Sequence, residues 1–278
     1  MRVRPFWNRY KKNRTAVFGT ILLILIFLTA LLAPIIAPYS PWHTRAGPTL
    51  IPPCQGYPFG TDDLGRDILS QLIWGSRISL IVGFFASGIS TFIGIIVGSL
   101  SGYYSGKLDK ILMGFAEMIL VIPDFVLALT MVALYGNSYL IIIFVIALAG
   151  WPSTARLVRG EFLSHRERAY VEAAKSIGLK DRELIFGEIL PNTIPPVIVN
   201  ASIGVARAIL IEAGLSFLGA GDPNVISWGY MLYNAFRFIH ESWWMITIPG
   251  IALFITAVSL NLIGDGLNDA LNPRLKHI

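Results

Sequence analysis

Six long stretches with few or no charged side chains constrain what this chain can fold into. They cover residues 15–39, 78–106, 111–134, 140–155, 194–218 and 243–264. The hydrocarbon core of a bilayer requires about 20 consecutive apolar residues per helix. The stretches are continuous and do not alternate between polar and apolar residues, which favours helices over the strands of a membrane barrel. We therefore predict an all-α membrane protein with about six transmembrane helices.

The composition argues against a soluble globular fold. Hydrophobic residues make up 54% of the 278 residues, charged residues make up 14%, and the mean hydropathy is +0.64. One soluble core cannot enclose that much apolar surface, so much of it must face lipid. The first stretch follows a basic segment but is too long for a signal peptide, and we interpret it as a retained helix.

Lys and Arg concentrate on alternate connections between the stretches. Most of the 22 basic residues lie before residue 15, at 107–110, between 156 and 182, and after 273. Because positive side chains are enriched on the cytoplasmic side, we predict a multi-pass protein of the cell (inner or plasma) membrane with both termini in the cytoplasm. The same asymmetry explains the net charge of +5, so we expect membrane lipid and no nucleic acid as a partner.

We divide the chain into residues 1–77 and 78–278. The first part contains a cytoplasmic tail, the first transmembrane helix and an external segment with the lone Cys54, which cannot form an intrachain disulfide. The second part is a core of five helices. Its long cytoplasmic connection, residues 156–191, has too many charges to enter lipid.

The external segment contains an acidic stretch, residues 60–67 (Gly-Thr-Asp-Asp-Leu-Gly-Arg-Asp). Cation binding is one interpretation, but the stretch lacks the alternating ligands and closing Glu of a calcium loop. We prefer a capped amphipathic helix that lies on the outer surface and starts near Thr61. Its apolar face would carry Leu64, Ile68, Leu72 and Ile73.

The cytoplasmic connection has a helical pattern. Val171, Ala174 and Ile177 recur at a spacing of three, which predicts a short helix that Gly178 ends. A second helix, capped by Asp181 and stopped by Pro191, is predicted to follow. The pattern alone leaves two interpretations open: a surface that another protein binds, or an amphipathic hairpin resting on lipid headgroups.

Several motifs together resemble one family. Residues 170–178 (Tyr-Val-Glu-Ala-Ala-Lys-Ser-Ile-Gly) and 189–192 (Ile-Leu-Pro-Asn) resemble the Glu-Ala-Ala loop of ABC importer permeases. Residues 32–39, 60–67, 215–219, 261–267 and 269–275 are similar to segments of the C-type permeases of the oligopeptide, dipeptide and nickel group. The resemblance implies a type I ABC importer permease fold with a cytoplasmic coupling helix that docks onto an ATPase. The coupling residues it implies are Tyr170, Glu172, Ala173, Ala174, Gly178, Leu190 and Pro191.

The resemblance also implies partners. These are a second, homologous permease subunit that completes a heterodimer, two ATPase subunits and an extracytoplasmic solute-binding protein. The sequence contains no G-x-x-x-x-G-K-[ST] phosphate loop, because Gly106-Lys107 is followed by Leu108. We therefore expect ATP hydrolysis on separate subunits and no catalytic residue, cofactor or metal site in this chain. Di- or oligopeptides are the substrate that the resemblance favours.

Four ionisable residues fall inside the predicted helices: Glu117, Asp124, Arg207 and Glu212. Glu117 and Asp124 are seven positions apart and would share one helix face, toward a pore or toward structural partners; we prefer the structural role. Arg207 and Glu212 are five apart, so we expect each to have a partner on another helix or subunit. Arg207 beside a pore would suit a substrate carboxylate, although a structural role is again preferred.

Other functions stay open. An ion-coupled secondary transporter would use such acids for coupling but often shows inverted repeats, which we do not find here. A membrane scaffold would also fit six helices. Within the resembled family, nickel and oligosaccharides are alternatives to peptides.

Overall fold

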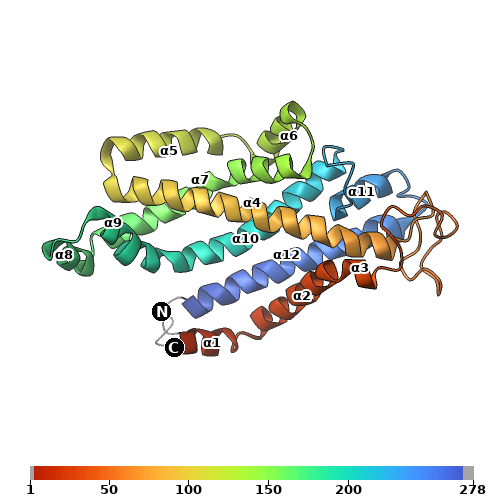
Figure 1. Cartoon of the computed structure of the whole chain (residues 1–278), viewed down its shortest axis with the longest axis horizontal. Coiled ribbons are helices and arrows are strands. Elements are labelled where there is room, and N and C mark those ends of the chain that lie inside the picture. Colours follow the sequence, from red (N-terminus) through yellow and green to blue (C-terminus); the bar gives the residue numbers. More distant parts are fainter. Residues whose placement is uncertain (1–2, 272–278) are drawn as a thin grey trace.

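The computed structural model describes residues 3–271, and it is built almost entirely of helices (Figure 1). The elements in chain order are α1 Val3–Tyr10, α2 Arg14–Leu31, α3 Ala33–Ile36, α4 Ile68–Tyr104, α5 Gly106–Leu120, α6 Asp124–Tyr135, α7 Tyr139–Arg166, α8 Ala169–Ser176, α9 Asp181–Glu183, the π-helical turn η1 Leu184–Ile189, α10 Leu190–Phe217, α11 Trp228–Phe236 and α12 Trp243–Leu271. Five helices are long and apolar enough to cross a membrane, and six if the bent pair α5–α6 is one span. The predicted all-α membrane fold is confirmed.

The long helices run along the long axis of the molecule. Figure 1 shows α4, α7, α10 and α12 extended in this direction, with α2 beside α12. α8 and α9 lie at one end, which we call the α8 end; α11 and the segment between α3 and α4 lie at the opposite end. The segments beside the two termini meet, because the Asn13 Nδ2 atom donates to Asp269 Oδ2 at 2.9 Å. Residues 272–275 of the motif 269–275 lie outside the described residues.

α4 and α7 form the most extensive helix pair. Gly94, Gly98 and Gly102 follow one stripe of α4 and face Thr154, Ala155 and Phe162 of α7. A Cβ atom on Gly94 would lie only 2.6 Å from Thr154 Cβ, so the backbones approach more closely than larger residues allow.

The acidic stretch at residues 60–67 does not form the predicted surface helix. Instead it is a tight turn organised by Asp62, whose carboxylate accepts hydrogen bonds from the Leu64 and Arg66 amides at 2.9 and 2.8 Å. The same carboxylate accepts from Arg66 Nε at 2.6 Å and Gln71 Nε2 at 2.9 Å. The Asp62 oxygens are therefore occupied by protein donors, an arrangement that gives no support to cation binding.

α4 begins at Ile68, ten positions before the apolar stretch that predicted it. Asp67 is its N-cap and accepts from the Ser70 amide at 2.8 Å. Ile68, Leu72 and Ile73, predicted on a separate surface helix, thus lie in the first turns of a membrane helix. Helix α4 runs across residue 77, and the division of the chain at that position stays a prediction.

The third apolar stretch is broken into α5 and α6, which meet at 85°. The break covers residues 121–123 and includes Pro123, which has no amide hydrogen to continue an α-helical ladder. Glu117 and Asp124 therefore lie on different helices, and the prediction that they share one helix face was wrong.

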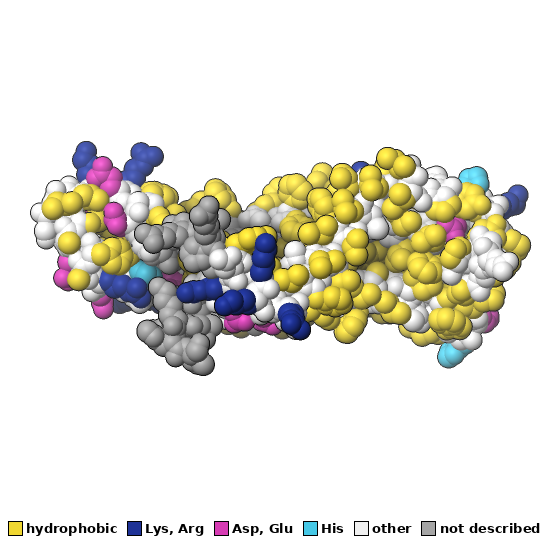
Figure 2. Space-filling view, turned by 90° about the horizontal axis from the view of Figure 1, so that it is seen from below, with side chains coloured by type: hydrophobic (Ala, Val, Ile, Leu, Met, Phe, Trp, Pro, Cys, Tyr) yellow, Lys and Arg dark blue, Asp and Glu magenta, His cyan; other side chains and the backbone are white. Residues whose placement is uncertain are grey.

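α7, α10 and α12 all extend beyond the apolar stretches that predicted them. α7 continues to Arg166 and α12 to Leu271, since charged residues end the part of a helix that suits lipid without ending the helix. Figure 2 shows hydrophobic side chains over much of one face, whereas most Lys and Arg side chains in that view gather in the half that carries α8.

Candidate functional site

Two parts of the molecule have the polar or exposed character of a functional site: the loop at the α8 end and a cavity between the long helices. The loop begins with α8, which ends in a Schellman motif. Gly178 has φ +86°, its amide donates to the Lys175 carbonyl at 2.9 Å, and the Leu179 amide donates to the Ala174 carbonyl at 3.2 Å. A left-handed residue is required here, so Gly178 ends α8 as predicted.

One face of α8 is packed against the rest of the protein. Val171 and Ala174 are buried in a cluster that includes Phe162 of α7 and Leu184 of η1. The apolar stripe predicted on this helix is therefore right for two of its three members. Ile177, the third, is 79% exposed, because it lies at the C-cap where the chain turns away.

Polar contacts fix the loop to two long helices. Tyr103 of α4 donates its hydroxyl hydrogen to Asp181 Oδ1 at 2.7 Å. On α7, His165 Nδ1 and the Tyr170 hydroxyl are 2.8 Å apart. Burial raises the pKa of the Tyr170 hydroxyl, which further favours the neutral form that can donate a hydrogen bond. Tyr170 therefore has an anchoring position beneath the loop.

The exposed residues of the loop combine charge with apolar surface. Glu172 and Ala173 are exposed, and so are two large apolar side chains, Ile177 at 79% and Phe186 at 60%. We call these four residues the loop surface. Phe186 was missed by the sequence reasoning, because an isolated apolar residue between buried ones gives no periodic signal.

The loop continues into α10 without a break. Asp181 is the first residue of α9 and its N-cap is Lys180, whose amide donates to Glu183 Oε2 at 2.8 Å, so the prediction that Asp181 caps this helix was wrong. The expected stop at Pro191 is also absent, because η1 widens the helix just before the proline and Leu190 and Pro191 form the first turn of α10.

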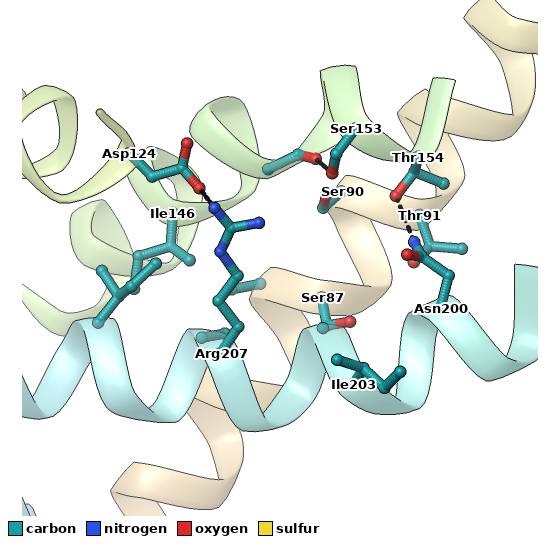
Figure 3. A pocket seen from close by; sticks show the side chains of 15 residues that line it. Ser87, Ser90, Thr91, Asp124, Ile146, Ser153, Thr154, Asn200, Ile203 and Arg207 are labelled. Carbon is teal, nitrogen blue, oxygen red and sulfur yellow. Dashed lines mark hydrogen bonds and ion pairs between the residues drawn. The ribbon is translucent and has the colours of Figure 1, made fainter. Parts of the chain in front are cut away.

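The second part is a polar cavity of about 90 Å³ lined by residues of α4, α6, α7 and α10 (Figure 3). Its polar side chains come from all four helices. They are Ser87, Ser90 and Thr91 of α4, Asp124 of α6, Ser153 and Thr154 of α7, and Asn200 and Arg207 of α10. We call this the polar cavity.

An ion pair lies at one side of the polar cavity. The Arg207 guanidinium on α10 points toward the Asp124 carboxylate on α6, and the two groups are in direct contact (Figure 3). The Arg207 side chain is 55% exposed and that of Asp124 is 16% exposed. The expectation that Arg207 has a partner on another helix is confirmed.

Hydroxyl and amide groups form the rest of the polar wall. Asn200 Nδ2 donates to Thr154 Oγ1 at 3.0 Å, and the Ser87 hydroxyl donates to the Ala201 carbonyl at 2.9 Å. The sequence analysis did not single these residues out. A signal was present on α4, where Ser87, Ser90 and Thr91 follow the i, i+3, i+4 spacing of one helix face.

Glu117 and Glu212 lie away from the polar cavity. Glu117 borders a separate cleft with Arg156 and Arg159. Glu212 is buried and accepts hydrogen bonds from the Ser216 and Ser227 hydroxyls, each at 2.7 Å. Of the four ionisable residues predicted inside the helices, the structure brings only Asp124 and Arg207 together.

Metal ligation has little support in the part of the chain that the structure describes. No group of three or more His, Cys, Asp or Glu residues within residues 3–271 has the arrangement of a metal site. Cys54 is exposed in the segment before α4.

Comparison with known sequence families gives two matches. Residues 90–277 match the family described as "binding-protein-dependent transport system inner membrane component". Residues 3–53 match the "N-terminal TM domain of oligopeptide transport permease C". The two matched regions include α2, the polar cavity except Ala86 and Ser87, and the loop at the α8 end.

Curated relatives match the chain over nearly its whole length. It is 38% identical to the dipeptide transport system permease protein DppC of Haemophilus influenzae, covering 99% of this chain and 95% of that protein. It is 35% identical to the oligopeptide transport system permease protein OppC of Bacillus subtilis, covering 96% and 88%. Among solved structures, an inward-facing MetNI methionine ABC transporter matches with a TM-score of 0.61 at 20% identity, over 73% of this chain and 96% of the other. This structural likeness concerns the fold.

Proposed function

The chain belongs to the family of binding-protein-dependent transport system inner membrane components, and from this premise we propose that it imports di- or oligopeptides as one half of an ATP-driven translocation pathway. The observation that carries the proposal is the likeness, over almost the full chain, to permeases of dipeptide and oligopeptide systems. The polar cavity supports it further, because a peptide crossing the membrane needs donors and acceptors for its amides and termini.

The complete importer contains further subunits. A second, homologous permease faces this one, two ATPase subunits bind on the cytoplasmic side, and a solute-binding protein delivers peptide from outside. The chain has no phosphate-binding loop of its own, which supports ATP hydrolysis on separate subunits. In this arrangement the α8 end and both termini are cytoplasmic, consistent with the basic residues concentrated there.

The loop surface is the contact for the ATPase. Glu172 offers a charge, and Ala173 permits close approach. Ile177 and Phe186 offer apolar side chains, and covering them with a partner stabilises the complex. These two apolar side chains lie on a charged loop, where lipid does not cover them under the proposed topology. A protein partner is therefore favoured over lipid headgroups.

Movement of the loop reaches the polar cavity through α10. The buried side of the loop moves with α7 and η1, because Val171 and Leu184 belong to one packed cluster. η1 continues into α10, which carries Asn200 and Arg207 into the cavity. ATP-driven closure of the ATPase pair would thereby tilt or turn α10 and open the pathway alternately to each side.

The test is co-purification of the full complex, followed by its ATPase activity and ATP-dependent uptake of a labelled dipeptide in proteoliposomes. Glu172→Ala and Gly178→Asp should weaken ATPase retention or uncouple hydrolysis from uptake. Gly160→Asp is the matched control: it introduces the same charge on α7 in equally open space, but without a left-handed backbone.

Each alternative function has its own outcome in this test. Uptake that needs an ion gradient and no ATP would favour a secondary transporter. ATP-dependent uptake of nickel or an oligosaccharide, with none of peptide, would keep the importer and change its substrate. Retention of the ATPases by both variants at the wild-type level, with unchanged coupling, would reject the loop surface as the contact.

A further inference from the structure

Arg207 is placed differently from the other charged residues inside the bundle. Its side chain lines the polar cavity and is 55% exposed, whereas Glu212 is buried and bonded to two serines. A charge at membrane depth is costly and usually serves a partner or a pathway. Asp124 satisfies one side of the guanidinium, yet the group has five N–H donors in a planar fork that matches a carboxylate.

The surroundings of Arg207 suit the end of a peptide chain. Beside it the cavity presents Ser87, Ser90 and Thr91 from one helix and Asn200 from the same helix as Arg207 (Figure 3). Hydroxyl and carboxamide groups both donate and accept, so they can pair with the amides next to a terminal carboxylate whatever the side chains are. At about 90 Å³ the cavity is small beside the pockets that hold whole ligands, which suits a terminal group.

We propose that Arg207 binds the terminal carboxylate of the transported peptide, and that Asp124 is the counter-ion that holds the guanidinium when no peptide is present. This inference rests on the proposed function. On arrival of the peptide, its carboxylate replaces the Asp124 carboxylate on one edge of the guanidinium, so the cavity exchanges one charge-assisted pair for another. The Arg207 guanidinium thus keeps an anionic partner with or without peptide.

A structural ion pair and a ligand site predict different variant patterns. If the pair only joins α6 to α10, the loss of either partner removes the same contact, and Lys at position 207 preserves it. If Arg207 serves the ligand, Asp124→Asn leaves the essential group in place, whereas Arg207→Gln removes it. Lys then performs poorly, because it cannot bind a carboxylate in a bidentate manner.

The experiment uses the whole complex in proteoliposomes, with saturating binding protein loaded with radiolabelled dialanine. We expect Arg207→Gln to lower ATP-driven uptake by about tenfold to a hundredfold, the loss for one charge-assisted pair, while binding-protein-stimulated ATP hydrolysis persists. Arg207→Lys should fall between Arg207→Gln and wild type, and Asp124→Asn should lower uptake less than Arg207→Gln does. The matched control is Arg159→Gln, which breaks the α5–α7 ion pair to Asp109 outside the cavity and should preserve uptake.

Other results would separate a failure of the carboxylate site from a failure of the proposed function. Equal losses for Arg207→Gln and Asp124→Asn, or wild-type uptake by Arg207→Gln, would overturn the carboxylate site and leave the importer standing. If the complex with Arg207→Gln does not assemble, Arg207→Lys provides the test. Wild-type uptake by the Lys variant would overturn the carboxylate site, whereas reduced uptake with intact ATP hydrolysis would support it. A wild-type complex that takes up no peptide with ATP would reject the proposed function itself.

Discussion

Tyr103 and Asp181 are 78 positions apart in the sequence, and the tyrosine hydroxyl donates a 2.7 Å hydrogen bond to the aspartate carboxylate. The bond joins α4 to the start of α9. It is a long-range tether that holds the loop at the α8 end against the long helices, together with the apolar cluster around Phe162.

The first prediction removes this tether. Tyr103→Phe keeps the ring and deletes the hydroxyl, so it should destabilise the attachment of the loop by about 1.5–3 kcal/mol, the usual range for a hydrogen bond to a charged group. Hydrogen exchange should accelerate in α8 and α9, with little change in α12. Tyr104→Phe, which alters the neighbouring exposed tyrosine, is the control; equal effects from both variants would contradict the tether.

The second prediction concerns the contact between α4 and α7. Gly94→Val should lower the stability of the purified protein by about 1–3 kcal/mol, because its Cβ would overlap Thr154 and force the helices apart. Gly88→Val is the matched control on the same helix, since no atom lies within 4 Å of a Cβ at that position. Thermal unfolding in detergent should separate the two variants; equal melting temperatures would refute the close approach.

The third prediction tests the turn before α4. Asp62 accepts four hydrogen bonds and pairs with Arg66, whose side chain is 6% exposed. Asp62→Ala should cost about 3–5 kcal/mol, the usual penalty for breaking a buried ion pair from one side. Limited proteolysis should then cut within residues 60–67, and a variant as resistant as wild type would show that the pair does not hold this turn.

The fourth prediction concerns the side-chain carboxyl of Asp63, the residue after Asp62. Burial, followed by repulsion from Asp62, raises the pKa of the Asp63 side chain. A carboxyl with a raised pKa destabilises the folded state above that pKa, and the penalty disappears as pH falls below the unfolded value of about 3.9. Asp63→Asn should therefore stabilise the protein at pH 7 and lose this advantage near pH 4. Melting temperatures at both pH values provide the check, and an advantage that grew on acidification would contradict the shift.

Much of the fold could be predicted because hydrophobicity at membrane scale is a strong signal. Each of the six apolar stretches corresponds to a helix or a helix pair, and the spacing of Val171, Ala174 and Ile177 predicted the short helix that Gly178 ends. Errors arose where the chain departs from a simple rule. Pro123 breaks a stretch whose hydropathy is continuous, and η1 lets a helix pass Pro191 where a proline normally favours a stop.

The polar cavity was harder to predict because it depends on tertiary contact. Asp124 and Arg207 are 83 positions apart and meet only because α6 turns by 85° against α5. The serines and threonines of α4 lie on one helix face, but such residues also occur where helices pack closely. Whether such residues line a cavity or pack against another helix depends on the neighbouring helices, which a single sequence does not specify.

The unbroken passage from η1 into α10 limits how the two ends of this protein can move. Displacement of one end of such a segment is passed to the other, and a screw motion by one residue position moves a side chain about 1.5 Å along the axis and turns it by about 100°. A turn of that size would carry Arg207 off the wall that it shares with Asp124. The position of the loop and access to the cavity would then change together. A substitution that prevents movement at one end should therefore also prevent movement at the other.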